Sequence, residues 1–97
     1  MSTPAANVQR NASSHRFEIA GEPSAFLQYA EADGRIRLIH TEVPVSLRGR
    51  GYATDLAHSA LEYARSARLQ VVPICPFVRA YLARHPEYAP LVEPAQP

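Results

Sequence analysis

The chain has 97 residues, enough for one domain with a modest core, and its 46% hydrophobic and 20% charged residues are ordinary for a globular protein. A formal net charge of +1 argues against a protein that binds duplex nucleic acid through bulk charge. The single cysteine, Cys75, excludes an intrachain disulfide and argues against a cysteine-based zinc site.

The ends of the sequence carry no recognisable targeting or membrane segment. No apolar run approaches the ~18–20 residues of a spanning helix, and the first residues lack the apolar core of a secretory signal. We therefore expect a cytoplasmic protein without a membrane partner. Residues 1–14 and 93–97 are small and polar without periodicity, so we expect two tails around a single domain at residues 15–92.

Three strands are predicted in the first half of the chain. Polar and apolar residues alternate over 15–20, 25–30 and 35–43, with the period of a half-buried strand. Asp33-Gly34 is a strong hairpin signal between the second and third segments, and Pro44 stops regular pairing. The strands should form an antiparallel meander. On the third strand we expect Ile36 and Leu38 on one face, with His40 as a further candidate for it, and Thr41 on the other.

The period changes in the second half of the chain. Apolar residues recur at helical spacing between about Gly49 and Arg65. A short β-branched strand over 69–72 and a short helix over 76–84 follow, the latter with a proline in its first turn. A strand–helix–strand crossover normally leaves parallel strands. The expected fold is therefore α/β (α+β): an antiparallel meander followed by a βαβ unit in one mixed sheet, in the order β-β-β-α-β-α.

The long helix opens on Arg48-Gly49-Arg50-Gly51, although glycine is a poor helix former. A helix N-terminus exposes unpaired N–H groups, and glycines let a ligand approach them closely. Together with the two arginines, this pattern favours a cradle for phosphate or pyrophosphate. It matches neither the P-loop nor the dinucleotide fingerprint. A flexible loop with solvated arginines is the alternative interpretation.

Several side chains are candidates for chemistry, each with a structural alternative. Cys75 lies at the predicted start of the second helix, where a thiol pKa can be lowered, or it packs in the core. Glu42 and His40, near the end of the third strand, could accept a proton or be solvated. Tyr81 could take part in catalysis or pack in the core, and core packing is favoured. The segment 85–88 is expected to end the helix and pack Tyr88, and the histidines lack metal-ligand spacing, so no metal is expected.

Over residues 15–92 the chain resembles the GNAT superfamily of N-acetyltransferases, specifically its short single-domain branch. The superfamily's acetyl-CoA motif, Gln/Arg-x-x-Gly-x-Gly/Ala, matches Ser46-Leu47-Arg48-Gly49-Arg50-Gly51 at both glycines and departs from it at Ser46. The segments HTEVP, LRGRGYATDLAHSALEYAR and VVPICPFVRAYLARHPEY follow in the order and spacing of the branch. Their joint occurrence carries the resemblance.

The resemblance implies a GNAT-like sheet whose third and fourth strands splay apart in a central V. The slot would hold the pantetheine arm of acetyl-CoA as cosubstrate, with its pyrophosphate on the amides of residues 48–51 and without a metal. The short branch lacks elements that shape the acceptor site in longer members, so that site should be open. The implied contacts with CoA are Val43, Val45, Leu47, Arg48, Gly49, Arg50, Gly51, Tyr52, Ala53, Cys75, Pro76, Phe77 and Tyr81.

The activity implied is transfer of an acetyl group to an amine acceptor. On a direct route, Glu42 is the first choice of base and His40 the second, and Cys75 or Tyr81 donates a proton to the leaving thiolate. On a second route, Cys75 is the nucleophile and forms an acetyl-cysteine intermediate. We favour the direct route.

Two other functions are compatible with the sequence. One is a regulatory module that binds CoA or acyl-CoA without catalysis. The other is a small nucleic-acid binder that uses Arg35, Arg37, Arg48 and Arg50, although it lacks a recognised motif and nucleic acid is the less favoured partner. The acceptor and the oligomeric state are not predicted.

Overall fold

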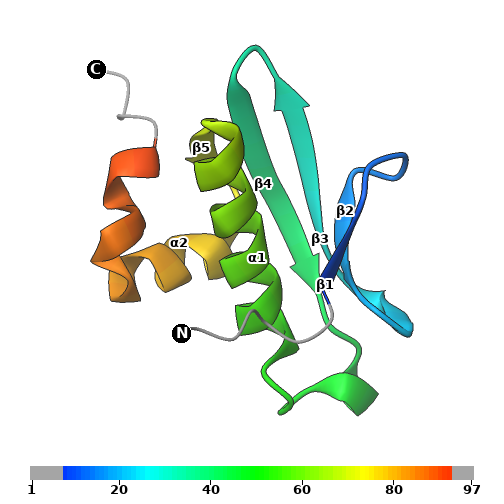
Figure 1. Cartoon of the computed structure of the whole chain (residues 1–97). Coiled ribbons are helices and arrows are strands. Elements are labelled where there is room, and N and C mark those ends of the chain that lie inside the picture. Colours follow the sequence, from blue (N-terminus) through cyan, green and yellow to red (C-terminus); the bar gives the residue numbers. More distant parts are fainter. Residues whose placement is uncertain (1–7, 93–97) are drawn as a thin grey trace.

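The computed structural model describes residues 8–92 as a five-stranded mixed sheet with the helices gathered on one side of it (Figure 1). The strands lie in sequence order across the sheet, β1-β2-β3-β4-β5. The strands are β1 (Val8–Asn11), β2 (Arg16–Ile19), β3 (Glu22–Ala32), β4 (Arg35–Glu42) and β5 (Gln70–Pro73). The helices are the 3-10 turn η1 (Val45–Leu47), α1 (Tyr52–Ala67), α2 (Pro76–Arg84) and the 3-10 helix η2 (Pro86–Leu91). The predicted mixed α/β fold is confirmed.

The antiparallel meander forms as the alternation predicts. Asp33 and Gly34 both have positive φ angles, 54° and 76°, which suits a tight turn between right-twisted strands. The side chains that point toward the helices are buried, whereas those on the other face are exposed or half-buried. The buried set on β2, β3 and β4 is Phe17, Ile19, Ala25, Leu27, Tyr29, Ile36 and Leu38.

The predicted tail over residues 1–14 is wrong where the structure describes it. Val8–Asn11 forms β1 and pairs antiparallel with β2, with Val8 packed against the core. The other residues of this strand are polar, so no apolar alternation marks it in the sequence. Arg10 instead lays its guanidinium 4.5 Å from the centre of the Tyr63 ring. Residues 1–7, like the predicted tail over 93–97, lie outside the described residues.

Helix α1 covers the inner face of the sheet. It begins at Tyr52, three residues after the predicted start, because Gly49 and Gly51 adopt left-handed conformations that a helix does not contain. Its apolar stripe is fully buried against the strands, and the small alanines let the helix lie close to them. The buried stripe is Leu56, Ala57, Ala60, Leu61 and Ala64.

A β-bulge on β4 decides which side chains face the helices beyond Leu38. Tyr29 pairs with Leu38 and Gln28 pairs with His40, so Ile39 is left without a partner on β3. Strand side chains alternate between the two faces of the sheet, so one extra residue moves every later side chain to the opposite face. Thr41 therefore lies opposite buried Leu27 on the inner face. The candidate placement of His40 beside Leu38 and the expected placement of Thr41 on the opposite face are both wrong, because the bulge puts His40 on the outer face and Thr41 on the inner one.

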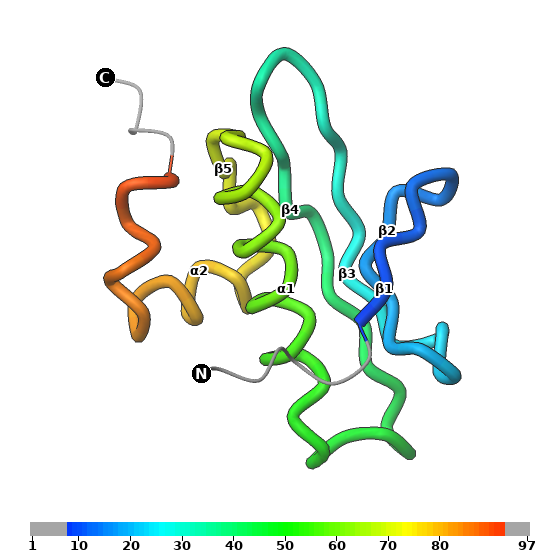
Figure 2. Tube along the Cα trace, viewed as in Figure 1, coloured from blue at the N-terminus to red at the C-terminus, as the bar shows by residue number. Residues whose placement is uncertain are grey.

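Strands β4 and β5 pair in parallel and then part. The register runs from Arg35 with Gln70 to Leu38 with Pro73, as the crossover predicts. The Leu38 carbonyl then accepts hydrogen bonds from the amides of Ile74, at 3.0 Å, and Cys75, at 2.8 Å. Beyond this point the chain turns into α2, while β4 continues to Glu42 (Figure 2). The expected splay between the two strands is present.

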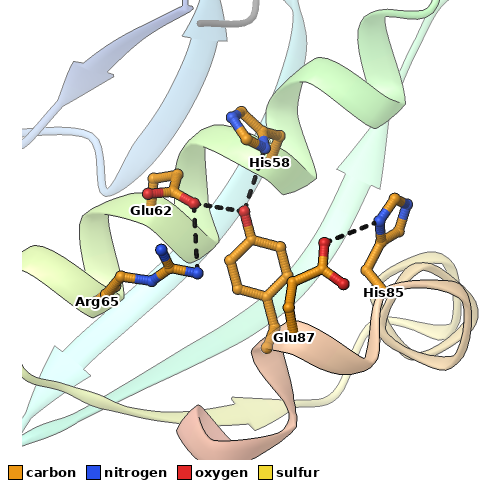
Figure 3. Close-up of polar contacts among 6 residues, drawn as sticks. His58, Glu62, Arg65, His85 and Glu87 are labelled. Carbon is orange, nitrogen blue, oxygen red and sulfur yellow. Dashed lines mark hydrogen bonds and ion pairs between the residues drawn. The ribbon is translucent and has the colours of Figure 1, made fainter. Parts of the chain in front are cut away.

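Tyr88, in η2, joins the C-terminal part of the domain to α1 through side-chain contacts. Figure 3 shows His58, Glu62 and Arg65, the α1 side chains of this contact. The buried Tyr88 hydroxyl donates to Glu62 at 2.5 Å and accepts from Nδ1 of His58 at 3.2 Å. The guanidinium of Arg65 lies 5.1 Å from the centre of the Tyr88 ring and pairs with Glu62. Tyr88 is therefore a packed residue, as expected for the segment that ends α2.

No helix among residues 8–92 is long and apolar enough to cross a membrane.

Replacing Tyr88 with Phe should lower the free energy of unfolding by about 1–3 kcal/mol, because it removes a bond to a carboxylate and leaves Glu62 without this donor. Tyr63→Phe is the matched control, since its hydroxyl bonds Glu31 at an exposed position and should cost less. Urea unfolding of both variants checks the difference. Equal losses would show that Tyr88 is not the fastening contact.

Candidate functional site

A cavity of about 370 Å³ opens between the end of β4, the loop before α1 and the first turn of α2. One end is formed by the glycine-arginine loop and the first turn of α1, and the other by β4 and Phe77 at the start of α2. The lining residues are Thr41, Val43, Leu47, Arg48, Gly49, Gly51, Tyr52, Ala53, Thr54 and Phe77.

The loop end of the cavity presents backbone donors. Gly49 and Gly51 have φ angles of 85° and 78°, and Gly51 is the N-cap of α1 without a side-chain cap. Among residues 8–92 the amides of Tyr52, Ala53 and Thr54 have no hydrogen-bond acceptor. A Cβ on either glycine would meet no atom within 4 Å. The glycines are therefore required by their backbone conformation, and the space in front of them is open.

The two arginines of the loop have different surroundings. Arg48 lines the cavity and donates from Nε to the Val43 carbonyl at 3.1 Å. Arg50 lies 3.5 Å from Glu22, in the segment that begins β3, and does not line the cavity. Val45 is 76% exposed and likewise lies outside the lining. Only Arg48 therefore adds its charge directly to the cavity wall.

Cys75 is the N-cap of α2 and is not itself among the residues that line the cavity. Its side chain is buried, and its Sγ lies 3.4 Å from Oγ1 of Thr41, which lines the cavity. Burial raises the pKa of the Cys75 thiol, but the Thr41 hydroxyl and the nearby backbone of Val78, Phe77 and Thr41 lower it by more. The net pKa lies below the ordinary thiol value, which favours the thiolate.

Tyr81 and Pro76 follow on α2 but do not line the cavity. The Tyr81 ring is buried and stacks on His85, with the ring centres 4.1 Å apart. Burial raises the pKa of the Tyr81 phenol, and the carboxylates of Glu87, Glu62 and Asp55 raise it further. The phenol is therefore held in its protonated form.

His40 and Glu42 form a pair on the outer face of the sheet. His40 Nε2 lies 3.0 Å from Glu42 Oε1, and both side chains are exposed. The rings of His40 and Phe26 meet edge to face with their centres 6.3 Å apart. Of the predicted catalytic residues, Cys75 lies behind Thr41 of the cavity wall, whereas His40 and Glu42 lie on the opposite face of β4.

Two lining residues were missed in the sequence, Thr41 and Thr54. Thr54 lies in the first turn of a helix whose start was predicted too early. Thr41 turns toward Cys75 only because of the bulge at Ile39, which depends on the partner strand. The motif HTEVP marked the segment but not the side chain that enters the site.

The arrangement suits a long ligand with an anionic end. Unpaired amides, a helix N-terminus and Arg48 would bind phosphate groups, and the unpaired edge of β4 leads from them toward a low-pKa thiol. Among the described residues no group of three or more His, Cys, Asp or Glu side chains is arranged to hold a metal ion. A model of the "GCN5-related N-acetyl-transferase" family matches residues 16–91. The chain belongs to the GCN5-related N-acetyltransferase family.

Relatives and solved structures agree with the family. Protein NATD1 from Homo sapiens, Mus musculus and Gallus gallus is 38% identical over 63 residues, which are 64% of this chain. The match spans a little over half of those relatives, 56–57% of their length. The solution structure of a GCN5-like protein from Staphylococcus aureus superposes with a TM-score of 0.70, at 21% identity, over 97% of this chain and 94% of that one. It shows the same fold.

The family and fold confirm the resemblance to N-acetyltransferases. Of the arginines named for the nucleic-acid interpretation, Arg48 lies in the cavity wall, whereas Arg35 and Arg37 lie on β4. The family's characteristic reaction is acetyl transfer.

Thr41→Val should raise the pKa of the Cys75 thiol, because it removes the hydroxyl that stabilises the thiolate. The thiolate absorbance followed against pH measures this, and Cys75 is the only thiol in the sequence. Thr54→Val is the control, because Thr54 lines the same cavity but has no hydrogen bond to Cys75. An unchanged titration in Thr41→Val would contradict the assigned role of the hydroxyl.

Proposed function

We propose that the protein binds acetyl-CoA in the cavity and transfers the acetyl group to an amine. The observation that carries the proposal is the continuity of the site. The cavity joins the unpaired amides at the start of α1 to Thr41, which contacts a thiol of lowered pKa where β4 and β5 part.

The residues of the cavity fit the parts of CoA. The pyrophosphate would accept hydrogen bonds from the amides of residues 52–54 and lie close to Arg48, with the left-handed glycines leaving room for it. The pantetheine arm would follow β4 past Val43 and Thr41, whose strand edge is released from β5 beyond Leu38. Phe77 would cover the arm from α2. The thioester would then lie near Cys75.

The direct route uses both faces of β4. The acceptor amine reaches the thioester from the outer face, where the His40–Glu42 pair takes its proton. The nitrogen forms a bond to the acetyl carbon, and the carbon–sulfur bond to CoA breaks. Cys75 or Tyr81 returns a proton to the departing thiolate, a role that suits Tyr81 because its raised pKa keeps the phenol protonated.

The acetyl-cysteine route remains the alternative. The Cys75 thiolate attacks the thioester carbon, CoA leaves as its thiol, and the amine then attacks the new thioester on Cys75. The lowered pKa of Cys75 favours this route, whereas burial of its side chain favours the direct one. Intact-protein mass spectrometry after mixing with acetyl-CoA distinguishes them. An acetyl adduct on Cys75 that disappears when an amine is added would overturn the direct route.

Gly51→Glu should abolish CoA binding measured by isothermal titration, because its carboxylate would lie against the proposed pyrophosphate site. Gly34→Glu is the matched control, since Gly34 has a similar φ of 76° with open space around it but lies in the β3–β4 turn. It carries the same backbone strain and should leave CoA affinity unchanged. Equal affinity in the Gly51 variant would refute the pyrophosphate cradle.

Catalysis is tested separately from binding by thiol release from acetyl-CoA in the presence of amines. Glu42→Gln should reduce the rate by about 10²–10⁴-fold, the usual effect of losing a general base, while CoA affinity is kept. If Glu42→Gln and Cys75→Ala both match wild type, the catalytic assignments fail. The exposed position of His40 and Glu42 would then favour a CoA-binding module without catalysis.

A further inference from the structure

The outer face of the sheet is uncovered by any helix in the part of the chain that the structure describes. Helices α1 and α2 lie on the other side of the sheet (Figure 1). The side chains on this face are exposed or half-buried. The register places on it Gln9, Arg16, Glu18, Phe26, Gln28, Ala30, Arg35, Arg37, His40, Glu42, Gln70 and Val72.

Arg37 is an unneutralised cation on this face. Its cross-strand neighbours are Ala30 on β3 and Val72 on β5, neither of which is polar. Within residues 8–92 its guanidinium has no hydrogen-bond or ion-pair partner, whereas Arg16 lies over the Phe26 ring. Arg37 also lines a small hollow of about 60 Å³ with Ala30, Ala32, Asp33 and Arg35. The small alanines leave room for a group of a few atoms beside the guanidinium.

The bulge brings Arg37 and His40 to the same face on either side of Ile39. The two residues are separated by roughly 10 Å of strand or less. Strands β4 and β5 part at Leu38, between them, so both side chains flank the place where the thioester would lie. A guanidinium and an imidazole–carboxylate pair are therefore directed to one surface beside the reaction point.

Two exposed isoleucines adjoin the same place. Ile39 is 36% exposed and Ile74 is 44% exposed, and the Ile74 amide bonds the Leu38 carbonyl, next to Ile39 in the chain. They are among the few large apolar side chains that the described fold leaves in solvent. Their position offers an apolar surface beside the two charged groups.

We propose that the amine acceptor is a small amino-acid-like molecule that carries an anionic group, and that Arg37 binds that group. The ammonium nitrogen lies at the His40–Glu42 pair, the carboxylate accepts hydrogen bonds from the guanidinium, and the carbon skeleton contacts Ile39 and Ile74. This inference rests on the proposed acetyl transfer. The amine loses its proton to the His40–Glu42 pair as nitrogen bonds the acetyl carbon and CoA departs.

The charges of this face select that class over a simple amine. An acceptor without an anion would leave Arg37 unpaired beside the bound substrate, and a cationic one would be repelled by it. An amino acid instead complements both ends, with its ammonium toward Glu42 and its carboxylate toward Arg37. The preference for amino acids thus comes from two charged contacts on the same strand, one with the ammonium group and one with the carboxylate.

Matched acceptors test the inference through initial rates of thiol release. Wild type should acetylate L-leucine and L-phenylalanine with a KM about 10–100-fold lower than for their carboxamides, the usual worth of a hydrogen-bonded charge pair. Arg37→Gln should raise the KM for the two acids toward that of the amides and leave kcat and the amide kinetics nearly unchanged. Arg84→Gln removes the same charge from the end of α2 and should change neither.

The outcomes separate this inference from the function on which it rests. Equal use of acids and amides, or an unchanged KM for the acids in Arg37→Gln, would overturn the role of Arg37 while acetyl transfer stands. Transfer to none of these amines would overturn the substrate class. In that case CoA titration, which needs no acceptor, would still test binding of the donor, and an acetyl adduct on Cys75 would still reveal the alternative route.

Discussion

The Leu38 carbonyl is the contact on which the site depends, because it is the last tie between β4 and β5. It accepts the amides of both Ile74 and Cys75. Pro73 has no amide to donate, and Pro76 begins α2, so the chain cannot continue the parallel ladder and turns away into a helix. The free edge of β4, the cavity beside it and the position of Cys75 at the cap of α2 all follow from this one break in pairing.

A single extra residue gives the two faces of β4 different roles. With Ile39 bulged, Thr41 faces inward and contacts Cys75, whereas His40 and Glu42 face outward. The strand can therefore hold a donor on its inner face and present a proton acceptor to the outer one. Without the bulge, His40 would point into the core and Thr41 to solvent, and neither face would carry its present chemistry.

Much of the fold was predictable because it depends on local patterns. Asp33-Gly34 marked the β3–β4 turn, Pro76 marked the first residue of α2, and the apolar stripe of α1 marked its buried face. Strand β1 was missed because its stability comes from backbone pairing and from Arg10 lying on Tyr63, neither of which is an apolar alternation. The contacts of Tyr88 with His58 and Glu62 join segments about thirty residues apart and left no local signal.

The sequence by itself determined the family, the order of the helices and strands from β2 onward, and the glycines that open α1. These depend on motif spacing and on the conformations that single residue types allow. Only the tertiary structure decided that Arg48 lines the cavity while Arg50 pairs with Glu22, and that Thr41 rather than His40 meets Cys75. The physical reason is that strand register and ion pairing are properties of two segments at once. A pattern read along one segment cannot fix which neighbour its side chains will face.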